Sequence, residues 1–207
     1  MVLNYGFVVA AMLCCLLGCA QDEPGSTTPP VRTEVDLEKL PSGVVDLDGL
    51  AFDLGVQTPA RAIVVLFTRS DCPISNRCAP AIARLCDVFQ RRGVDFYLVY
   101  VDPRETPESI RRHLQEYEYP CQALRDPRHA LVAYCQATTT PEAVVFDRDR
   151  KITYQGRIND QYADVGRARP EPTTHELADA IESTILGRPV ATPRTKPVGC
   201  PIADLHN

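Results

Sequence analysis

The sequence lacks tryptophan, and aromatic residues make up only 7% of its 207 residues. Such a chain offers few flat rings on which nucleic-acid bases or sugars could stack. It also lacks an excess of positive charge, because 22 Lys and Arg stand against 27 Asp and Glu, for a formal net charge of −5. Proteins that bind nucleic acid need basic surfaces to neutralise phosphates. We therefore expect no nucleic-acid partner, and the 44% hydrophobic content fits one soluble globular domain.

The apolar run near the N-terminus, residues 7–17, is too short to span a bilayer comfortably. It is typical of a secretory signal, although residues 1–6 lack the usual Lys or Arg. The run leads into Leu16-Leu17-Gly18-Cys19, which resembles the lipobox of bacterial lipoproteins. We expect residues 1–18 to be a lipoprotein signal peptide and Cys19 to be lipidated. This places the mature protein in the cell envelope, on the periplasmic or extracellular face of a bacterial membrane. A buried N-terminal helix is the alternative.

Nine cysteines are many for a chain of this length. Removal of the signal peptide discards Cys14 and Cys15 and leaves Cys19 lipidated, so six cysteines remain for the folded part. These are Cys72, Cys78, Cys86, Cys121, Cys135 and Cys200. An oxidising compartment permits thiol and disulfide chemistry. Many pairings of six cysteines are possible, and the sequence does not choose among them.

The composition divides the exported chain into three parts. Residues 19–43 are rich in Pro, Ser and Thr and have no hydrophobic period, as expected of a tether. Residues 44–187 carry the hydrophobic patterns of a folded domain, and residues 188–207 form a Pro-rich tail that contains Cys200. Near the start of the domain, Asp48-Gly49 lies between two short apolar segments and predicts a small β-hairpin.

Strand and helix patterns alternate through the first half of the domain. Residues 62–68 form an uninterrupted apolar run that predicts a strand covered on both faces of a largely parallel sheet. A helical pattern follows over 79–89, then a second buried strand over 94–101 and a helix over 107–119 that has a Pro near its start. With short connections, this βαβα order implies right-handed crossovers and an α/β fold.

The second half predicts an antiparallel addition to that sheet. Residues 126–134 suggest a short helix, and residues 143–146 and 152–155 suggest two strands joined by a charged turn. A capping box formed by Thr173 and Glu176 predicts the start of the last helix, which Gly187 closes. The expected product is a mixed central sheet with helices on both faces.

One cysteine lies at a point where chemistry is expected. The strand over 62–68 leads directly to Cys72, which stands at the N-terminus of the next helix. Unpaired N–H groups and the helix dipole favour the thiolate there, and the thiolate is the nucleophilic form of cysteine. The sequence therefore predicts a reactive thiol at Cys72.

The surrounding residues resemble the thioredoxin-like superfamily, and the resemblance covers roughly residues 44–187. Phe67, Cys72 and Pro80 match the strand end, the first cysteine and the helix proline of that family, and Thr140-Pro141 matches its cis-proline. Cys72-Pro73 is similar to the redoxin or AhpC/TSA branch. The resemblance implies a thioredoxin-like three-layer α/β/α sandwich with a mixed central sheet and an N-terminal β-hairpin. It also implies that Pro141 packs against a nucleophilic Cys72.

Two departures from the family patterns bear on the reaction. Ser75 stands where thioredoxins have their second cysteine, so dithiol exchange within that motif is excluded. Arg69 stands where peroxiredoxins have a Thr that aligns peroxide, which argues against efficient peroxidase activity. A resolving thiol must then come from elsewhere. We favour Cys200, on a tail expected to be mobile, over Cys78, which we expect on the far side of its helix. A permanent disulfide of Cys200 that anchors the tail is the alternative.

The other candidate residues have simpler explanations. Cys86 and Cys135 lie in apolar helical patterns and are expected as core thiols, and Cys121 either pairs with Cys135 or stays inert. Weak site candidates are the charged residues next to the reactive thiol and those in the long polar stretch after the last strand. Each of them could equally be a solvated loop residue. They are Arg69 and Asp71, whose effects on the pKa of Cys72 oppose each other, and Arg157 and Asp160.

The leading hypothesis is an extracytoplasmic thiol–disulfide oxidoreductase that needs no cofactor or metal. Cys72 is its nucleophile, Pro141 shapes the site, and Cys200 or Cys78 resolves the mixed disulfide. Its expected partners are protein thiols or disulfides, and a lipid anchor holds it to the membrane. A peroxiredoxin-like thiol peroxidase, using peroxide and a thiol reductant in an antioxidant role, is the second hypothesis. The third is a non-catalytic copper-handling module, whose candidate ligands are Cys72, Cys78 and either His129 or His175.

Overall fold

The computed structural model describes residues 41–54 and 59–203. The expected signal peptide, the lipidation site Cys19 and most of the expected tether lie outside the described residues. All described residues belong to one compact unit that spans residues 36–207. Within the described part of the chain, no helix is both long and apolar enough to cross a membrane.

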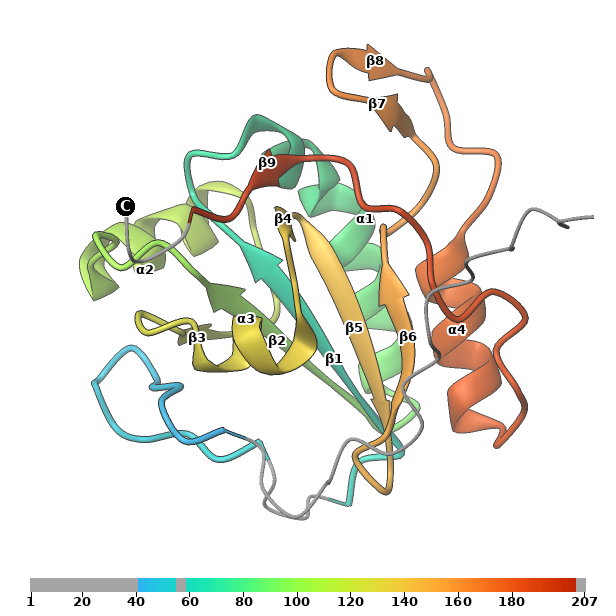
Figure 1. The fold of residues 1–207 in the computed structure, drawn as a ribbon, viewed down its shortest axis with the longest axis horizontal. Coiled ribbons are helices and arrows are strands. Elements are labelled where there is room, and N and C mark those ends of the chain that lie inside the picture. Colours follow the sequence, from blue (N-terminus) through green and yellow to red (C-terminus); the bar gives the residue numbers. More distant parts are fainter. Residues whose placement is uncertain (1–40, 55–58, 204–207) are drawn as a thin grey trace, which may run out of the picture. The chain divides into compact units, whose positions relative to one another are not determined.

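A five-stranded mixed sheet forms the centre of the fold (Figure 1). Its strand order is β3-β2-β1-β5-β6, with β1, β2 and β3 parallel and β5 and β6 antiparallel to their neighbours. Leu66 in the central strand pairs with Leu98 on one side and Ala143 on the other. The strands are β1 Ala62–Thr68, β2 Val94–Tyr100, β3 Gln122–Arg125, β5 Glu142–Asp147 and β6 Ile152–Gly156. Every residue of β1 is buried, as its uninterrupted apolar run predicted.

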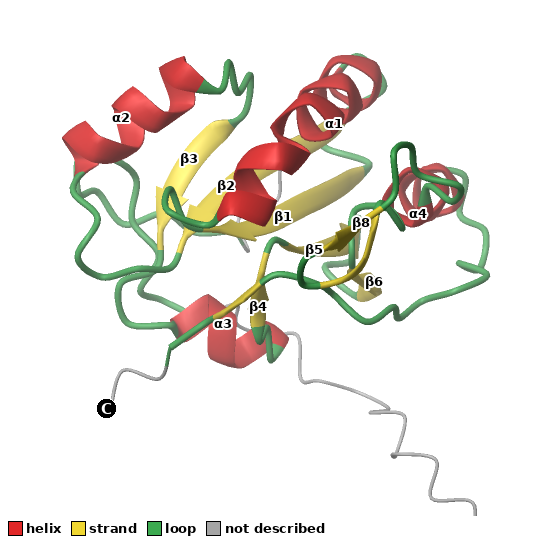
Figure 2. Cartoon of the chain, turned by 90° about the horizontal axis from the view of Figure 1, so that it is seen from above, coloured by secondary structure: helices red, strands yellow, loops and turns green. Residues whose placement is uncertain are grey.

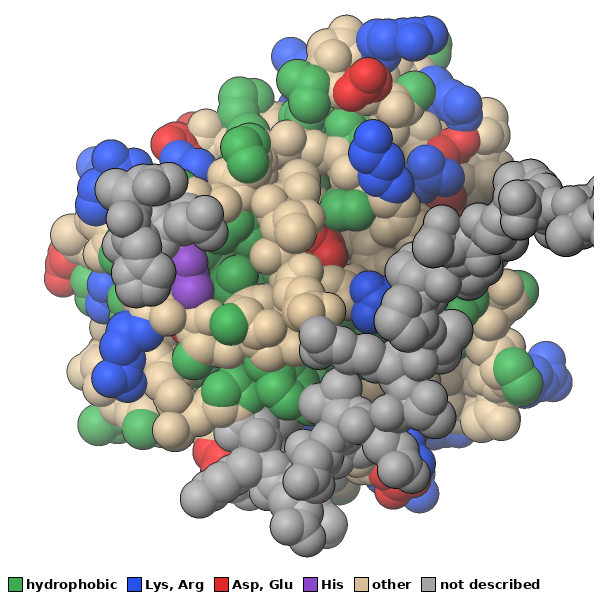
Figure 3. Space-filling model, in the orientation of Figure 1, with side chains coloured by type: hydrophobic (Ala, Val, Ile, Leu, Met, Phe, Trp, Pro, Cys, Tyr) green, Lys and Arg blue, Asp and Glu red, His purple; other side chains and the backbone are tan. Residues whose placement is uncertain are grey.

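Helices cover both faces of this sheet, which confirms the predicted three-layer α/β architecture (Figure 2). Three helices lie on one face and one lies on the other: α1 Pro73–Gln90, α2 Pro107–Glu116 and α4 Glu176–Ile185 against α3 Ala130–Cys135. Side chains of β1 alternate between the two faces, as a strand requires. Val64 and Leu66 join the core beneath α1 and α4, whereas Val65 and Phe67 join the core beneath α3. Basic and acidic side chains are interspersed on the face drawn in Figure 3.

The predicted N-terminal hairpin is present in reduced form. Val45 makes a single antiparallel bridge to Ala51, and Gly49 supplies the positive φ of +83° that the turn requires. A second bridge joins Val45 to Arg125 at the end of β3. The segment thereby covers the α3 face of the sheet, where Val44 and Leu54 are buried.

Four short strands were not predicted. Two of them, β7 Tyr162–Asp164 and β8 Arg167–Ala168, form a hairpin within the polar stretch that follows β6. The other two, β4 Thr139–Thr140 and β9 Cys200–Pro201, pair antiparallel and join the C-terminal tail to the residues before Pro141. The tail was expected to be mobile, but the structure holds it as a strand.

The beginning of α4 differs from the predicted capping box. His175 is the N-cap and its side chain makes no capping hydrogen bond. Thr173 instead donates both its backbone N–H and its hydroxyl to the carboxylate of Asp160. Glu176 forms an ion pair with Arg157 at the end of β6. Both residues of the expected box are thus engaged by partners that a local pattern does not reveal.

The start of α3 was also misplaced, because Asp126 caps the helix from a distance. The helix begins at Ala130, and the buried carboxylate of Asp126 accepts the backbone N–H groups of Ala130, Leu131 and Val132 at 2.8 to 2.9 Å. His129, between them, has the left-handed φ of +52°. The carboxylate therefore satisfies the free amides of the first turn without being part of the helix.

A disulfide joins Cys86 on α1 to Cys121, which directly precedes β3. This corrects the expectation that Cys86 is a core thiol, and it overturns both alternatives for Cys121, which was expected either to pair with Cys135 or to stay inert. Cys86 and Cys121 both belong to the core beneath α1, whereas Cys135 belongs to the core on the opposite face. Because the sheet separates the two cores, Cys121 cannot reach Cys135.

Replacement of Asp126 by Asn should destabilise the protein by about 2 kcal/mol or more, because one of the two acceptor oxygens becomes an amide NH2 group, a donor that faces buried N–H donors. Urea unfolding measures the loss. The matched control is Asp87→Asn at an exposed position on α1, which should change stability by less than about 0.5 kcal/mol. Equal effects of the two substitutions would contradict the assigned capping role.

Removal of the disulfide should lower the free energy of unfolding by about 3 kcal/mol, because the bridge closes a long loop in the unfolded chain. The test compares Cys86→Ala/Cys121→Ala with its parent in urea, with and without a reductant. Both carry Cys200→Ser, so that only this bridge can respond to the reductant. Reductant should destabilise the parent and leave the double variant unchanged. A parent that does not respond would show that the bridge is absent in solution.

Candidate active site

Cys72 occupies the N-cap position of α1, immediately beyond the loop that leaves β1. Its backbone is extended, with φ −84° and ψ 110°, and its sulfur accepts a hydrogen bond from the backbone N–H of Ser75 at 3.4 Å. Pro73 follows at the first helical position, where its missing N–H costs nothing. The side chain of Cys72 has no exposed surface. The helix therefore directs its N-terminal dipole at a buried sulfur.

A hydrogen-bond network fixes the loop before Cys72. The backbone N–H of Ser70 donates to the carboxylate of Glu105 at 2.7 Å, and its carbonyl accepts from Asn76 at 2.9 Å. The amide oxygen of Asn76 contacts Nε2 of His113, whose Nδ1 contacts the hydroxyl of Tyr100. Burial lowers the pKa of His113, against a smaller opposing effect of the nearby Glu116 carboxylate. Sequence reasoning missed Asn76 and His113, because a lone polar residue on a helix carries no signal of such a network.

Thr140 lies directly against the sulfur of Cys72, and Pro141 follows it in the chain. The bond between them is cis, and the Cys72 thiol donates to the carbonyl of Thr140 at 3.1 Å. The buried Glu142 fixes this turn through hydrogen bonds. Its carboxylate accepts from the Thr138 N–H at 2.9 Å and from the Gln155 side chain at 2.7 Å. The turn that faces Cys72 is thus anchored to the segment that follows α3 and to β6.

The C-terminal tail completes the site. In the register of β4 with β9, Thr140 lies opposite Cys200, and Thr139 lies opposite Pro201 (Figure 1). The Ile202 N–H extends the pairing to the carbonyl of Thr138 at 2.9 Å. Cys200 is a free thiol, so hydrogen bonds rather than an anchoring disulfide hold the tail. The pairing with Thr140, whose carbonyl accepts from the Cys72 thiol, brings Cys200 to the nucleophile.

Two glycines allow the tail to approach this closely. A Cβ at Gly199 would lie 2.0 Å from the carbonyl oxygen of Thr140, and a Cβ at Gly156 would lie 2.0 Å from the hydroxyl of Thr195. Along the same stretch, Gln155 donates its N–H to Pro193 and accepts one from Thr195. The tail is therefore seated along β6 and β4 at positions where only glycine fits without a shift.

The two thiols have opposite tendencies to ionise. Burial raises the pKa of Cys72, but hydrogen bonding to the side chains of Cys200, Ser75 and Thr140 and to the backbone N–H of Ser75 outweighs it, so that its pKa lies below the ordinary value. Burial, the hydrogen bond to Cys72 and the charge of that thiolate raise the pKa of Cys200 to about 11. The pair therefore favours a thiolate at Cys72 and a protonated thiol at Cys200.

Arg69 and Asp71 do not set the pKa of Cys72, although both were candidates. They form an ion pair with each other at 2.7 Å, and Arg69 also lies 3.8 Å from Asp102. Their opposite charges, which the sequence left unresolved, are used locally to shape the loop. Neither is among the largest causes that shift the pKa of Cys72, whereas both act on the pKa of Cys200, which Arg69 lowers and Asp71 raises.

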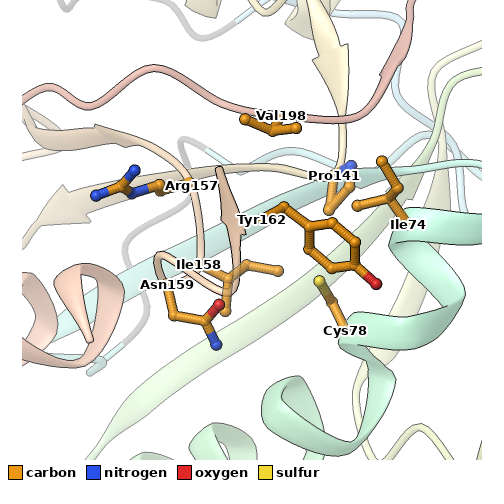
Figure 4. Close-up of a pocket in the computed structure, with 8 residues that line it drawn as sticks. All are labelled: Ile74, Cys78, Pro141, Arg157, Ile158, Asn159, Tyr162 and Val198. Atoms are coloured by element: carbon orange, nitrogen blue, oxygen red, sulfur yellow. The ribbon is translucent and has the colours of Figure 1, made fainter. Parts of the chain in front are cut away.

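Ser75 and Cys78 both lie next to this site, on α1. Ser75 is fully buried; its hydroxyl makes no hydrogen bond of good geometry, but it contributes to the low pKa of Cys72. The expectation that Cys78 points to the far side of the helix is wrong. Cys78 lines a pocket with Pro141 (Figure 4), and burial together with the neighbouring Cys72 raises its pKa to about 12. The expectation counted helical turns from Cys72 to Cys78. Cys72 is an N-cap residue with an extended backbone, so its side chain does not point in the direction that helical rotation assumes.

The remaining candidates are placed elsewhere. Asp160 accepts hydrogen bonds from Thr173 and Arg169, and these hold its pKa far below the usual range. Arg157 lines the pocket of Figure 4 but is held by its ion pair with Glu176. For the copper hypothesis, His129 forms a hydrogen bond with the Val101 carbonyl, and His175 occupies the N-cap position of α4. No three His, Cys, Asp or Glu residues within 41–54 and 59–203 are grouped so that they could hold a metal ion.

Solved structures with the same fold are known. An uncharacterized conserved protein from Geobacillus kaustophilus is 26% identical, with a TM-score of 0.69 over 82% of this chain and 92% of that one. A putative thiol:disulfide interchange protein DsbE from Chlorobium tepidum is 16% identical, with a TM-score of 0.52 over 72% and 94% of the two chains. A thioredoxin-like protein from Aeropyrum pernix is 18% identical, with a TM-score of 0.51 over 70% and 89%.

The fold is thus thioredoxin-like, as the sequence resemblance implied. No curated protein matches the sequence significantly. A family model does match, over residues 39–155, which include Cys72, Thr140 and Pro141, and its description is the AhpC/TSA family. Together with the buried, activated thiol, this match supports a thiol redox function. The chain is a member of the AhpC/TSA family.

Proposed function

We propose that the protein is a thiol–disulfide oxidoreductase in which Cys72 is the nucleophile and Cys200 is the resolving thiol. The observation that carries this proposal is the pairing of β9 with β4, which puts Cys200 opposite Thr140, the residue whose carbonyl accepts from the Cys72 thiol. Ser75 occupies the position of a second motif cysteine and offers a backbone N–H to the nucleophile instead. The second thiol of the reaction comes from the tail.

The reaction proceeds in two exchanges. The Cys72 thiolate attacks one sulfur of a substrate disulfide, a mixed disulfide forms, and the other substrate sulfur leaves as a thiolate that takes up a proton. Cys200, after loss of its proton, attacks Cys72, and the substrate's remaining sulfur leaves as the second thiolate. The substrate disulfide is reduced by two electrons, and Cys72 and Cys200 are oxidised to a disulfide. The reverse sequence oxidises a dithiol, and a thiol or disulfide partner resets the pair.

The charges in the site suit this order of events. After burial, the acceptor capacity and the negative charge of Cys72 are the largest causes that raise the pKa of Cys200. Both disappear when Cys72 enters a mixed disulfide, because a disulfide sulfur carries no charge. Cys200 then ionises more readily at the step in which it must attack. Pro141 assists by placing a residue without an N–H beside the nucleophile.

We further propose that the protein acts outside the cytoplasm, on protein thiols or disulfides, from a lipid anchor at Cys19. The apolar run 7–17 and the lipobox-like residues that follow support this location. The Cys86–Cys121 disulfide also supports it, because structural disulfides persist mainly in oxidising compartments. The similarity in fold to a protein described as a thiol:disulfide interchange protein is consistent with it.

Cys72 should react with iodoacetamide with a midpoint below the pH of an ordinary thiol. Its pKa is lowered, so the thiolate fraction, and with it the rate, reaches a plateau at lower pH. Cys200→Ala removes a hydrogen-bond donor and should move the midpoint upward. The readout is the midpoint of rate against pH, since burial slows the absolute rate. Cys135→Ala, on the opposite face of the sheet, is the control and should leave the midpoint unchanged. An ordinary midpoint in the parent protein would overturn the assignment of Cys72.

Mild oxidation should trap a Cys72–Cys200 disulfide, which peptide mapping by mass spectrometry identifies. Disulfide reductase activity should be lost in Cys72→Ser and fall about tenfold or more in Cys200→Ser, which accumulates the mixed disulfide. Cys78→Ser should retain activity, because the raised pKa of Cys78 keeps it a thiol. Peroxide consumption that depends on Cys72, without disulfide exchange, would instead establish a thiol peroxidase.

A further inference from the structure

The reactive sulfur has no open path to a large substrate in the described part of the molecule. Cys72 has no exposed surface, and β9 lies along β4 directly beside it. The strand β4 has only two residues, and its pairing groups toward the tail are taken by Thr140 with Cys200 and by Thr138 with Ile202. A sulfur on another chain therefore has to take the place that Cys200 holds.

We propose that β9 is an internal mimic of the substrate. This inference rests on the proposed function and adds the class of its substrate. The substrate is an extended protein segment that pairs antiparallel with β4 in place of β9, puts its cysteine opposite Thr140, and carries glycine immediately before that cysteine. A free sheet edge binds an extended peptide through main-chain hydrogen bonds, while the side-chain sites beside it select the sequence.

The requirement for glycine before the substrate cysteine follows from the atoms that surround Gly199. A Cβ there would lie 2.0 Å from the Thr140 carbonyl oxygen, 2.7 Å from its carbon and 3.1 Å from Cδ of Pro141. The crowding atoms are backbone and a proline ring, which cannot swing aside as a flexible side chain does. The same carbonyl oxygen also accepts from the Cys72 thiol, so a shift of Thr140 disturbs the nucleophile. A side chain before the substrate cysteine is therefore excluded from productive pairing.

Neighbouring positions of the mimic suggest further preferences. Val198, two residues before Cys200, closes the pocket formed by Ile74, Pro141 and Tyr162 (Figure 4). Ile202, two residues after Cys200, packs against the core on the α3 face. Pro201, between Cys200 and Ile202, is exposed, so the site does not select the side chain at the corresponding position of the substrate. The recognised pattern is an apolar residue, glycine and cysteine, followed by any residue and then a second apolar one.

The shared edge also links release of the substrate to its chemistry. One strand at a time can occupy β4, so the mixed disulfide forms while the tail is displaced. When Cys200 returns and attacks Cys72, the bond between Cys72 and the substrate sulfur breaks and the Cys72–Cys200 bond forms. The returning β9 takes the hydrogen bonds that held the substrate segment. The step that expels the thiolate therefore also expels the peptide.

Two synthetic peptides test this inference. One copies residues 197–202, Pro-Val-Gly-Cys-Pro-Ile, and the other has Val in place of Gly; in both, the cysteine is a mixed disulfide with thionitrobenzoate. Attack by Cys72 forms the protein–peptide disulfide and releases coloured thionitrobenzoate, whose appearance gives the rate. The protein is full-length Cys200→Ser, and each rate is divided by the rate of the same peptide with glutathione. We expect the Gly peptide to react at least about tenfold faster than the Val peptide, which corresponds to a clash of about 1.4 kcal/mol.

A second pair of variants tests competition by the tail. Gly199→Val, added to Cys200→Ser, should dislodge β9 and raise the rate with the Gly peptide about tenfold. Gly166→Val is the matched control: at a φ of +78° the Val strains the β7–β8 turn locally, but its Cβ meets no atom within 4 Å. It should leave the rate unchanged. A rate that does not respond to Gly199→Val would overturn the competition between tail and substrate.

The outcomes separate this inference from the proposed function. Equal corrected rates for the two peptides in Cys200→Ser would overturn the mimic even if Gly199→Val fails to fold. If dithiobis(nitrobenzoate), a small disulfide, reacts with Cys72 while neither peptide does, the substrate class is wrong and the nucleophile stands. If neither the small disulfide nor the peptides react faster with Cys200→Ser than with Cys72→Ser/Cys200→Ser, the proposed function itself fails.

Discussion

The pairing of β9 with β4 is the contact on which the rest of the site depends. It puts Cys200 opposite Thr140, whose carbonyl accepts from Cys72, so three groups from distant parts of the chain meet at one peptide unit. Burial alone would make the thiolate of Cys72 unfavourable. The hydrogen bond from Cys200 is the largest of the contributions that reverse this effect. The tail therefore both hides the nucleophile from solvent and favours its ionisation.

The sheet keeps this chemistry apart from the other cysteines. Cys86 and Cys121 are bonded to each other within the core beneath α1, and Cys135 is buried beneath the opposite face. Burial raises the pKa of Cys135 well above its ordinary range, so this thiol stays protonated. Cys78 lies beside Cys72 but is also kept protonated. Of the free thiols in the described chain, Cys72 alone has a lowered pKa.

Sequence patterns predicted the parts of the fold that depend on neighbouring residues. The apolar run 62–68 specifies a strand buried on both faces, and Cys72 follows it at a helix start, so the central strand and the nucleophile could both be located. Local patterns failed where distant groups compete. The sequence at Thr173 matches a capping box, but the backbone N–H of Thr173 donates to the carboxylate of Asp160 instead. The docked tail has no hydrophobic period, and its position depends on space at Gly156 and Gly199 that exists only in the folded chain.

The placement of the second thiol on the tail, rather than at position 75, changes what closure of the disulfide requires. A cysteine within the first turn of α1 would stay beside Cys72 throughout the reaction, whatever the substrate did. Cys200 is beside Cys72 only while β9 is paired, and that pairing uses the edge that a substrate segment needs. Oxidation of the pair and occupation of the site by substrate are therefore mutually exclusive. Because Ser75 still donates its backbone N–H to the sulfur, Cys72 keeps part of its activation while the tail is displaced.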